Sequence, residues 1–279
     1  MAEEITLSGE PARGSVPIDT SKPHPARMYD YYLGGKDHYP VDAEAAEQVL
    51  GHTPDARTFA RANRLFMHRA VRVLARDHGV RQFLDIGTGV PTEPNLHQVA
   101  QAEAPECRVV YADNDPIVLA HARALLHGTP EGRVAYVQAD VREPKAILES
   151  EEARTTLDFG RPIALSLCAV MHFVPDEHGA YEIVRELVDA LPSGSFLVLS
   201  HGTTDFDPVG MARTQEVYVR ARIPIQLRSG TQIGRFFDGT ELLQPGLAVT
   251  HRWRPEPDQP LADITDAQAG FYGGAARKP

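Results

Sequence analysis

Two glycines near residue 88 lie where this chain could bind a ligand. The stretch Phe83–Pro91 reads Phe-Leu-Asp-Ile-Gly-Thr-Gly-Val-Pro, so an apolar segment carries Asp85 and then enters a turn with Gly87 and Gly89. Glycine permits the tight backbone conformations that bring a loop close to a ligand. The stretch therefore predicts a buried strand that ends in a turn against a nucleotide-like cofactor.

Acidic residues end the next two apolar segments. Asp113 closes Val-Val-Tyr-Ala-Asp, and Asp140 closes Val-Gln-Ala-Asp. A carboxylate in the position of Asp113 can accept hydrogen bonds from both hydroxyls of a ribose. Asp140 can accept a hydrogen bond from the adenine amino group while the Val141 amide binds a ring nitrogen. We expect Asp115 instead to cap the helix that follows it.

Two classes of cofactor fit the glycine turn. A nicotinamide site favours Gly-x-Gly-x-x-Gly, in which amides at a helix N-terminus bind a pyrophosphate. Here Thr92 stands at the third glycine position, and Pro91 and Pro94 remove amide donors. Asp85 better suits a cofactor with an amine and a sulfonium cation. A tight turn without a ligand is the remaining alternative.

Strands and helices alternate in the segments that must position these residues. Strands are predicted at 82–86, 108–112, 134–138, 163–167 and 195–200, with helices near 92–104, 116–127, 142–153 and 176–191. This alternation predicts an α/β fold, a doubly wound and mostly parallel sheet with helices on both faces. A ligand belongs at the carboxyl ends of such strands.

The two ends of the chain suggest added layers. The first segment, residues 1–25, is rich in proline and is predicted to be a flexible tail. The next segment, residues 26–80, is predicted to form an N-terminal helical cover. Its first two helices end at Gly34 and Gly51, and a longer helix follows Asp55. Asp42 is the expected N-cap of the second helix. The core spans 81–279 with a lid insertion at about 205–230, a helix at 231–243 and strands at 247–253 and 268–276.

Composition excludes several classes of partner. The net charge of -10, without a Lys/Arg run, argues against nucleic-acid binding. Cys107 and Cys168 lie in apolar surroundings and predict buried thiols. Because we find neither a membrane-spanning stretch nor a signal peptide, the expected location is cytoplasmic, without a membrane partner.

These motifs resemble class I S-adenosylmethionine-dependent methyltransferases. Phe83–Pro91 is similar to their first motif, Asp113 to their ribose acid, Asp140 to their adenine acid and 169–176 to their post-strand motif. Residues 27–39 and 271–279 resemble a narrower family of S-adenosyl methyltransferases, formerly catalogued as a domain of unknown function. The resemblance implies S-adenosylmethionine as cofactor, a Rossmann-like seven-stranded sheet with an antiparallel last strand, and an N-terminal segment that closes over the cofactor. Further expected cofactor contacts are Asn114, Cys168, Tyr29 and Gly35.

Methyl transfer is an in-line displacement that can need a base. His172 and His201 follow the fourth and fifth predicted strands and are the candidate catalytic residues. The cover could line the pocket from above with Tyr29, Tyr32, Lys36, Asp37 and His38, or these residues could form only a packed helix end.

A metal site is not expected. His201, Asp205 and Asp207 have a suggestive spacing, but oxygen-rich loops are common. Phe236, Phe237 and Trp253 are predicted core residues.

The function predicted from the sequence is methyl transfer from S-adenosylmethionine to a small-molecule acceptor. The alternatives are an NAD-dependent oxidoreductase and a protein that binds S-adenosylmethionine without catalysis. The acceptor, the acceptor atom and the oligomeric state stay open at this point.

Overall fold

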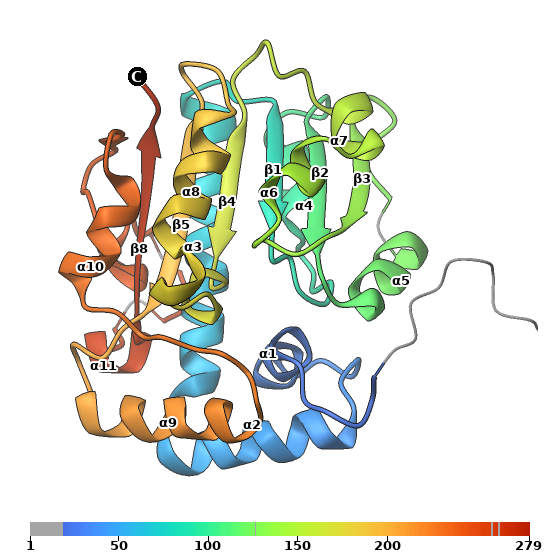
Figure 1. The fold of residues 1–279 in the computed structure, drawn as a ribbon. Helices are drawn as coiled ribbons and strands as arrows, with labels where there is room; N and C mark the ends of the chain where they lie inside the picture. Colours follow the sequence, from blue (N-terminus) through green and yellow to red (C-terminus); the bar gives the residue numbers. More distant parts are fainter. Residues whose placement is uncertain (1–18, 126, 258, 262) are drawn as a thin grey trace, which may run out of the picture.

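One sheet forms the centre of the molecule (Figure 1). The computed structural model describes residues 19–125, 127–257, 259–261 and 263–279. The strands are β1 (Gln82–Ile86), β2 (Arg108–Asp113), β3 (Arg133–Gln138), β4 (Ala164–Cys168), β5 (Phe196–Gly202), β6 (Glu241–Leu242), β7 (Ala248–Val249) and β8 (Phe271–Arg277). Their order is β3-β2-β1-β4-β5-β8-β6, with β7 also paired to β8. β1 to β5 are parallel and β8 is antiparallel to β5, which confirms the predicted doubly wound fold.

The edge of the sheet beyond β8 differs from the prediction. Instead of a strand over 247–253, the two short strands β6 and β7 pair separately with β8, so the described sheet has eight strands. The chain turns between them at Pro245, which has no amide to donate to a ladder. The helix expected over 231–243 is shorter than predicted: an α-helix over Gly230–Gly234 continues as a 3-10 turn over Arg235–Phe237, and Gly239, with a φ of 80°, then leads into β6.

Helices cover both faces of the sheet. The α-helices are α1 (Pro25–Leu33), α2 (Pro40–His52), α3 (Ala56–Asp77), α4 (Leu96–Glu103), α5 (Pro116–Leu125), α6 (Pro144–Leu148), α7 (Glu151–Thr156), α8 (Ala180–Asp189), α9 (Pro208–Arg220), α10 (Gly230–Gly234) and α11 (Asp266–Ala269). Short 3-10 turns are η1 (Met171–Phe173), η2 (Asp176–His178), η3 (Arg235–Phe237) and η4 (Thr250–Arg252). No helix among the described residues combines the length and apolar character needed to cross a bilayer.

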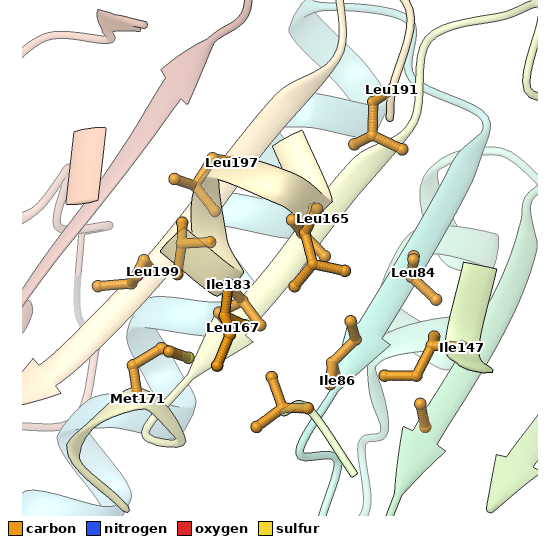
Figure 2. Packing of buried hydrophobic residues seen from close by; sticks show 14 of the residues in the cluster. Leu84, Ile86, Ile147, Leu165, Leu167, Met171, Ile183, Leu191, Leu197 and Leu199 are labelled. Carbon is orange, nitrogen blue, oxygen red and sulfur yellow. The ribbon is translucent and has the colours of Figure 1, made fainter. Parts of the chain in front are cut away.

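Each face of the sheet has its own apolar core, because successive side chains of a strand point to opposite faces. Figure 2 shows one core, in which Leu84, Leu165 and Leu197 from three neighbouring strands pack with Ile183 of α8. The next residue back in β1, Phe83, belongs to the opposite core with α3 and α4. Burial on both faces holds the parallel strands rigid and fixes where their carboxyl ends lie.

Helices α1, α2 and α9 lie beyond those carboxyl ends (Figure 1). α1 ends at Gly34, whose φ of 84° closes the helix as predicted. α3 joins this layer to the sheet, since Phe59 packs among the N-terminal helices and Phe66 packs on the sheet.

The start of α2 corrects one detail of the sequence prediction. Asp42 is not the N-cap, because α2 already begins at Pro40, whose missing amide suits a first helical position. The Asp42 carboxylate instead accepts hydrogen bonds from the amides of Tyr39 and His24, each at 2.8 Å.

Residues before α1 also have defined positions from Asp19 onward. Arg27 of α1 donates to the carbonyl oxygens of Asp19 and Lys22, each at 3.3 Å. The predicted tail boundary at 25 did not anticipate these contacts, and the remainder of that prediction, residues 1–18, lies outside the described residues.

Candidate functional site

A cavity of about 480 Å³ lies between the carboxyl ends of the parallel strands and the N-terminal helices. The cavity is lined by nine of the ten residues predicted to contact a cofactor. Tyr29 comes from α1, and the other eight lie on the sheet side: Asp85, Gly87, Gly89, Asp113, Asn114, Asp140, Val141 and Cys168. The topology brings them together, because β1, β2, β3 and β4 all end at this edge.

The turn after β1 is held by its own polar groups. Gly87 and Gly89 have φ values of 74° and 69°, a region that favours glycine. A Cβ on Gly87 would lie 2.5 Å from Val170 Cγ2, so the packing also requires glycine there. Thr88 Oγ1 donates to Asp85 Oδ2 at 3.1 Å, and burial raises the pKa of Asp85. A cationic group beside Asp85 would favour its ionised form.

Asp113 fixes the same turn from β2. Its Oδ2 accepts a hydrogen bond from the Gly89 amide at 2.9 Å, and its Oδ1 accepts one from the Asp115 amide at 2.9 Å. Burial raises the pKa of Asp113, and these two amides oppose that rise. An ionised carboxylate has about four acceptor positions, so about two remain for a ligand.

Asp140 lies in a polar part of the cavity. Its carboxylate accepts two side-chain hydrogen bonds from Arg142, at 2.9 Å and 2.7 Å, and one from Asn114 Nδ2 at 2.9 Å. Although burial alone would raise the pKa of Asp140, these bonds lower it to about 2. Arg142 also lines the cavity, a residue that the sequence reasoning missed although it stands two positions after Asp140.

The cover is attached to the sheet edge by a buried arginine. Arg27 Nε lies 3.1 Å from Asp115 Oδ2 and its Nη1 lies 3.5 Å from Asp42 Oδ2. Asp115 Oδ1 accepts from the Ile117 amide at 3.0 Å, so this residue caps α5 as predicted and also binds the cover. Only the folded chain brings Arg27 to Asp115, which the sequence reasoning did not foresee.

A series of hydrogen bonds connects α1 of the cover to the core. Tyr29 Oη lies 2.9 Å from the Ala60 carbonyl oxygen and accepts from Asn63 Nδ2 at 2.9 Å. Asn63 Oδ1 accepts from Ser200 Oγ at 2.5 Å, and the Ala169 amide donates to Ser200 Oγ at 3.0 Å. Burial raises the pKa of Tyr29 to about 12, so its hydroxyl stays neutral.

The far side of the cavity is mainly apolar. It is formed by α1, α2, α3, α9, the segment 221–227 and the start of β8. Residues 211–227 of the predicted lid insertion contribute much of this wall. We name this side the acceptor chamber, defined by Val49, Phe59, Phe173, Met211, Tyr218 and Ile225.

The two candidate bases have different surroundings. His201 does not line the cavity, which argues against its predicted catalytic role. Arg228 Nη1 lies 2.8 Å from His201 Nε2, and the Gly202 carbonyl oxygen lies 2.7 Å from Nδ1. Because a guanidinium only donates, Nε2 must accept and Nδ1 must carry the proton. Burial, with His172 and Arg228 nearby, also holds the pKa of His201 well below its usual range.

His172 does line the cavity, next to the acceptor chamber. Its Nδ1 is buried without a hydrogen-bond partner. Burial, and secondly the Arg228 guanidinium, lowers the pKa of His172 to about 3. The imidazole is therefore neutral at physiological pH and binds a proton only weakly.

Arg228 explains the position of this histidine pair. It is completely buried, donates to the carbonyl oxygens of Met171 and Val174 at 3.1 Å and 2.9 Å, and forms an ion pair with Asp176 at 2.6 Å. These contacts attach the segment 221–229 to the loop after β4. The buried contacts could not be inferred from Arg228 in sequence, because arginine is most often exposed.

Several predicted contacts do not reach the cavity. Gly35 packs against Asp30, where a Cβ would lie 1.8 Å from Oδ1, and this contact rather than a ligand requires glycine. His38 also contacts Asp30, with Nδ1 and Oδ2 at 2.9 Å. Lys36 and Asp37 are likewise absent from the lining, whereas Tyr32 is present.

The remaining side chains with possible chemistry have structural surroundings. Burial raises the pKa of Cys168 to about 12, so this lining residue stays a thiol. Asp205 accepts from the Gly230 amide at 2.8 Å, and Asp207 caps α9. Within the described part of the chain, no three His, Cys, Asp or Glu side chains form a group that could hold a metal ion. Trp253 is completely buried in the core.

Comparison with known proteins agrees with this geometry. A model of the S-adenosyl methyltransferase family matches residues 11–279. The chain belongs to the S-adenosyl methyltransferase family. S-adenosylmethionine is therefore its cofactor, and the sheet edge described above offers acidic side chains and a glycine turn that fit this molecule.

Solved structures of family relatives share the whole fold. A DUF574 family protein from Streptomyces avermitilis is 49% identical, covers 94% of this chain and 100% of its own, and superimposes with a TM-score of 0.91. A protein from Thermobifida fusca that is assigned as a methyltransferase is 36% identical, with 93% and 96% coverage and a TM-score of 0.85.

More distant similarity concerns the fold alone. The plantazolicin methyltransferase BpumL, in complex with S-adenosylhomocysteine, is 11% identical over 91% of this chain and 95% of its own, with a TM-score of 0.50. No curated protein matches the sequence.

Proposed function

We propose that this family member transfers a methyl group from S-adenosylmethionine to a small-molecule acceptor. The observation that supports this proposal is the continuity of the cavity, which is lined both by the cofactor residues of the sheet edge and by the acceptor chamber. A donor and an acceptor that share one cavity can reach the in-line arrangement that displacement at a methyl carbon requires.

The proposed cofactor contacts are the acidic side chains and the amide that line the sheet edge. The cofactor supplies an electrophilic methyl group on a sulfonium. We infer that Asp113 accepts hydrogen bonds from the ribose hydroxyls, since about two of its acceptor positions are unused. Asp140 and the Val141 amide are the proposed adenine contacts. Arg142 and Asn114 already donate four hydrogen bonds to the Asp140 carboxylate, so the adenine amino group would replace one of these donors. Asp85 is the proposed partner of the cofactor's cationic end.

His172 has a different proposed role from the one expected of a base. Its low pKa makes it a weak proton acceptor, but a neutral imidazole still forms hydrogen bonds. We infer that His172 orients the acceptor, and that a proton lost from the acceptor passes to water.

A thermal-shift comparison tests the cofactor. A ligand at about a hundred times its Kd stabilises a protein by about 2.7 kcal/mol, or roughly 5 °C in Tm for a chain of this size. We expect such a shift with S-adenosylmethionine and with S-adenosylhomocysteine, and none with NAD. The opposite ranking would favour the oxidoreductase alternative, which the Thr92 position already disfavours.

Turnover separates a methyltransferase from a protein that only binds the cofactor. Formation of S-adenosylhomocysteine is measured with uncharged aromatic alcohols and amines as acceptors. We expect formation that depends on the acceptor. Tight cofactor binding without turnover for any acceptor would support the non-catalytic alternative.

A further inference from the structure

Aromatic rings surround the acceptor chamber in an unbroken series. The ring centroids of Phe59 and Phe271 are 6.2 Å apart, those of Phe271 and His172 are 5.6 Å apart, and those of His172 and Phe173 are 4.3 Å apart. Phe173 and Tyr218 continue the series at 5.6 Å. All five residues line the cavity, and we name them the aromatic wall.

The aromatic wall comes from four separate parts of the chain. Phe59 lies on α3, His172 and Phe173 on η1, Tyr218 on α9 and Phe271 on β8. Phe59, His172, Tyr218 and Phe271 are each less than a tenth exposed. Such rings bind flat apolar groups through offset or edge contacts. The wall therefore suits a ligand that contains a ring.

Charged side chains of the cavity lining are concentrated away from the aromatic wall. Asp85, Asp113, Asp140 and Arg142 lie at the sheet edge. Arg64 also lines the cavity, and its guanidinium donates to the carbonyl oxygen of Pro94 at 2.8 Å.

Arg222, in the segment that follows α9, also lines the cavity, but its side chain is exposed, whereas Ile223 and Ile225 beside it are buried. A charged ligand group against the buried aromatic wall would lose its water and, away from the exposed Arg222, would gain no opposite charge, which is unfavourable.

Polar groups within the acceptor chamber are neutral. The hydroxyls of Tyr32 and Tyr218 lie 3.4 Å apart, a weak contact that leaves each able to bind a ligand group. Burial keeps the pKa of both tyrosines above the usual value, so neither is ionised. Thr53 and Thr214 instead bind each other at 2.7 Å.

We propose that the acceptor is an uncharged aromatic or other ring molecule that lies against the aromatic wall and forms few hydrogen bonds. This inference rests on the proposed function, because it assigns the acceptor class of the same cavity. It excludes phosphorylated, sulfonated and carboxylated acceptors whose charged group enters the chamber.

Binding to the protein saturated with S-adenosylhomocysteine tests this proposal. Naphthol and aminonaphthalene are titrated against their sulfonated counterparts by calorimetry. We expect each uncharged probe to bind at least about tenfold more tightly than its sulfonate. Equal or tighter binding of the sulfonates, or no binding of either uncharged probe, would overturn the proposal.

Two valine variants locate the binding. Val49 lines the chamber, whereas Val209 is 64% exposed on α9. Val49→Phe fills the chamber and should weaken naphthol binding at least about tenfold, with S-adenosylhomocysteine affinity within about threefold. Val209→Phe makes the same change at the surface and should alter neither. If Val49→Phe does not fold, Ile225→Phe makes the same test from the segment after α9.

The outcomes separate the two proposals. Failure of S-adenosylhomocysteine to bind the unaltered protein would contradict the proposed function, and the probe titrations on the unloaded protein would still decide the acceptor class. If S-adenosylhomocysteine binds but neither Val49→Phe nor Ile225→Phe changes the naphthol affinity, only the proposed acceptor class is overturned.

Discussion

Replacing Asp113 with alanine should weaken cofactor binding more than it weakens the fold. The carboxylate contributes two bonds inside the protein, to the amides of Gly89 and Asp115 at 2.9 Å each, and leaves about two acceptor positions toward the cavity. Because the internal bonds hold the glycine turn, the substitution removes the proposed ribose contacts and loosens the turn beside them.

The magnitude follows from the number of bonds. A hydrogen bond to a charged group contributes about 1.5 to 3 kcal/mol, so two ribose contacts at the lower value give about 3 kcal/mol, or about a hundredfold in Kd. The two internal amides lose their acceptor at about 1 kcal/mol each, and water in the cavity offsets part of that loss.

Calorimetry with S-adenosylhomocysteine measures the change in Kd, and urea unfolding measures the change in stability. Asp158→Ala is the matched control, because Asp158 also accepts a backbone hydrogen bond, from Gly160 at 2.9 Å, but lies outside the cavity lining. We expect the control to leave Kd unchanged. A folded Asp113→Ala protein whose Kd rises less than about threefold would refute the ribose assignment.

Three further substitutions test the packing around the site by urea unfolding. Gly87→Ala should lower the free energy of unfolding by at least about 1 kcal/mol more than Gly79→Ala does. Both glycines have positive φ, but only at Gly87 would the added Cβ meet another side chain, Val170. Equal losses of stability would contradict this. His172→Asn should flatten the pH dependence of stability between pH 4 and 6 by up to about 1.4 kcal/mol per pH unit. The unfolded chain protonates this histidine below about pH 6.5 and the folded chain only near pH 3, so stability falls as pH falls, and an unchanged slope would contradict the burial argument. Arg228→Met should destabilise the fold by about 3 kcal/mol, since buried carbonyl oxygens and a carboxylate lose their donor, and a loss below about 1 kcal/mol would show that water replaces it.

The convergence of the proposed cofactor residues at one edge of the sheet was largely predictable from sequence. A parallel α/β sheet places the ends of its strands at one edge, so Asp85, Asp113 and Asp140 converge whenever the strands are identified correctly. The glycine turn was predictable for a related reason, because few residues other than glycine tolerate its backbone conformation. These features depend on local sequence and on the topology of one sheet.

Contacts between distant segments were predicted less well. Position 35 requires glycine because its backbone packs against Asp30. The sequence does not distinguish this reason from contact with a ligand. His201 follows the strand predicted over 195–200, but β5 extends to Gly202 and includes it, and Arg228, 27 positions later, donates to its Nε2. The pairing depends on how the segment after α9 folds back, which no local pattern specifies.

Residue type and periodicity were enough to predict the parallel α/β sheet, the glycine turn and the three acids that end successive strands, although not the paired edge strands β6 and β7. That the turn after β1 and the aromatic wall line one cavity became evident only from the folded chain. Phe59, His172, Tyr218 and Phe271 are far apart in the chain, and their side chains come together only when α3, η1, α9 and β8 pack around the cavity. The physical reason is that burial and charge at a site are properties of all the segments around it.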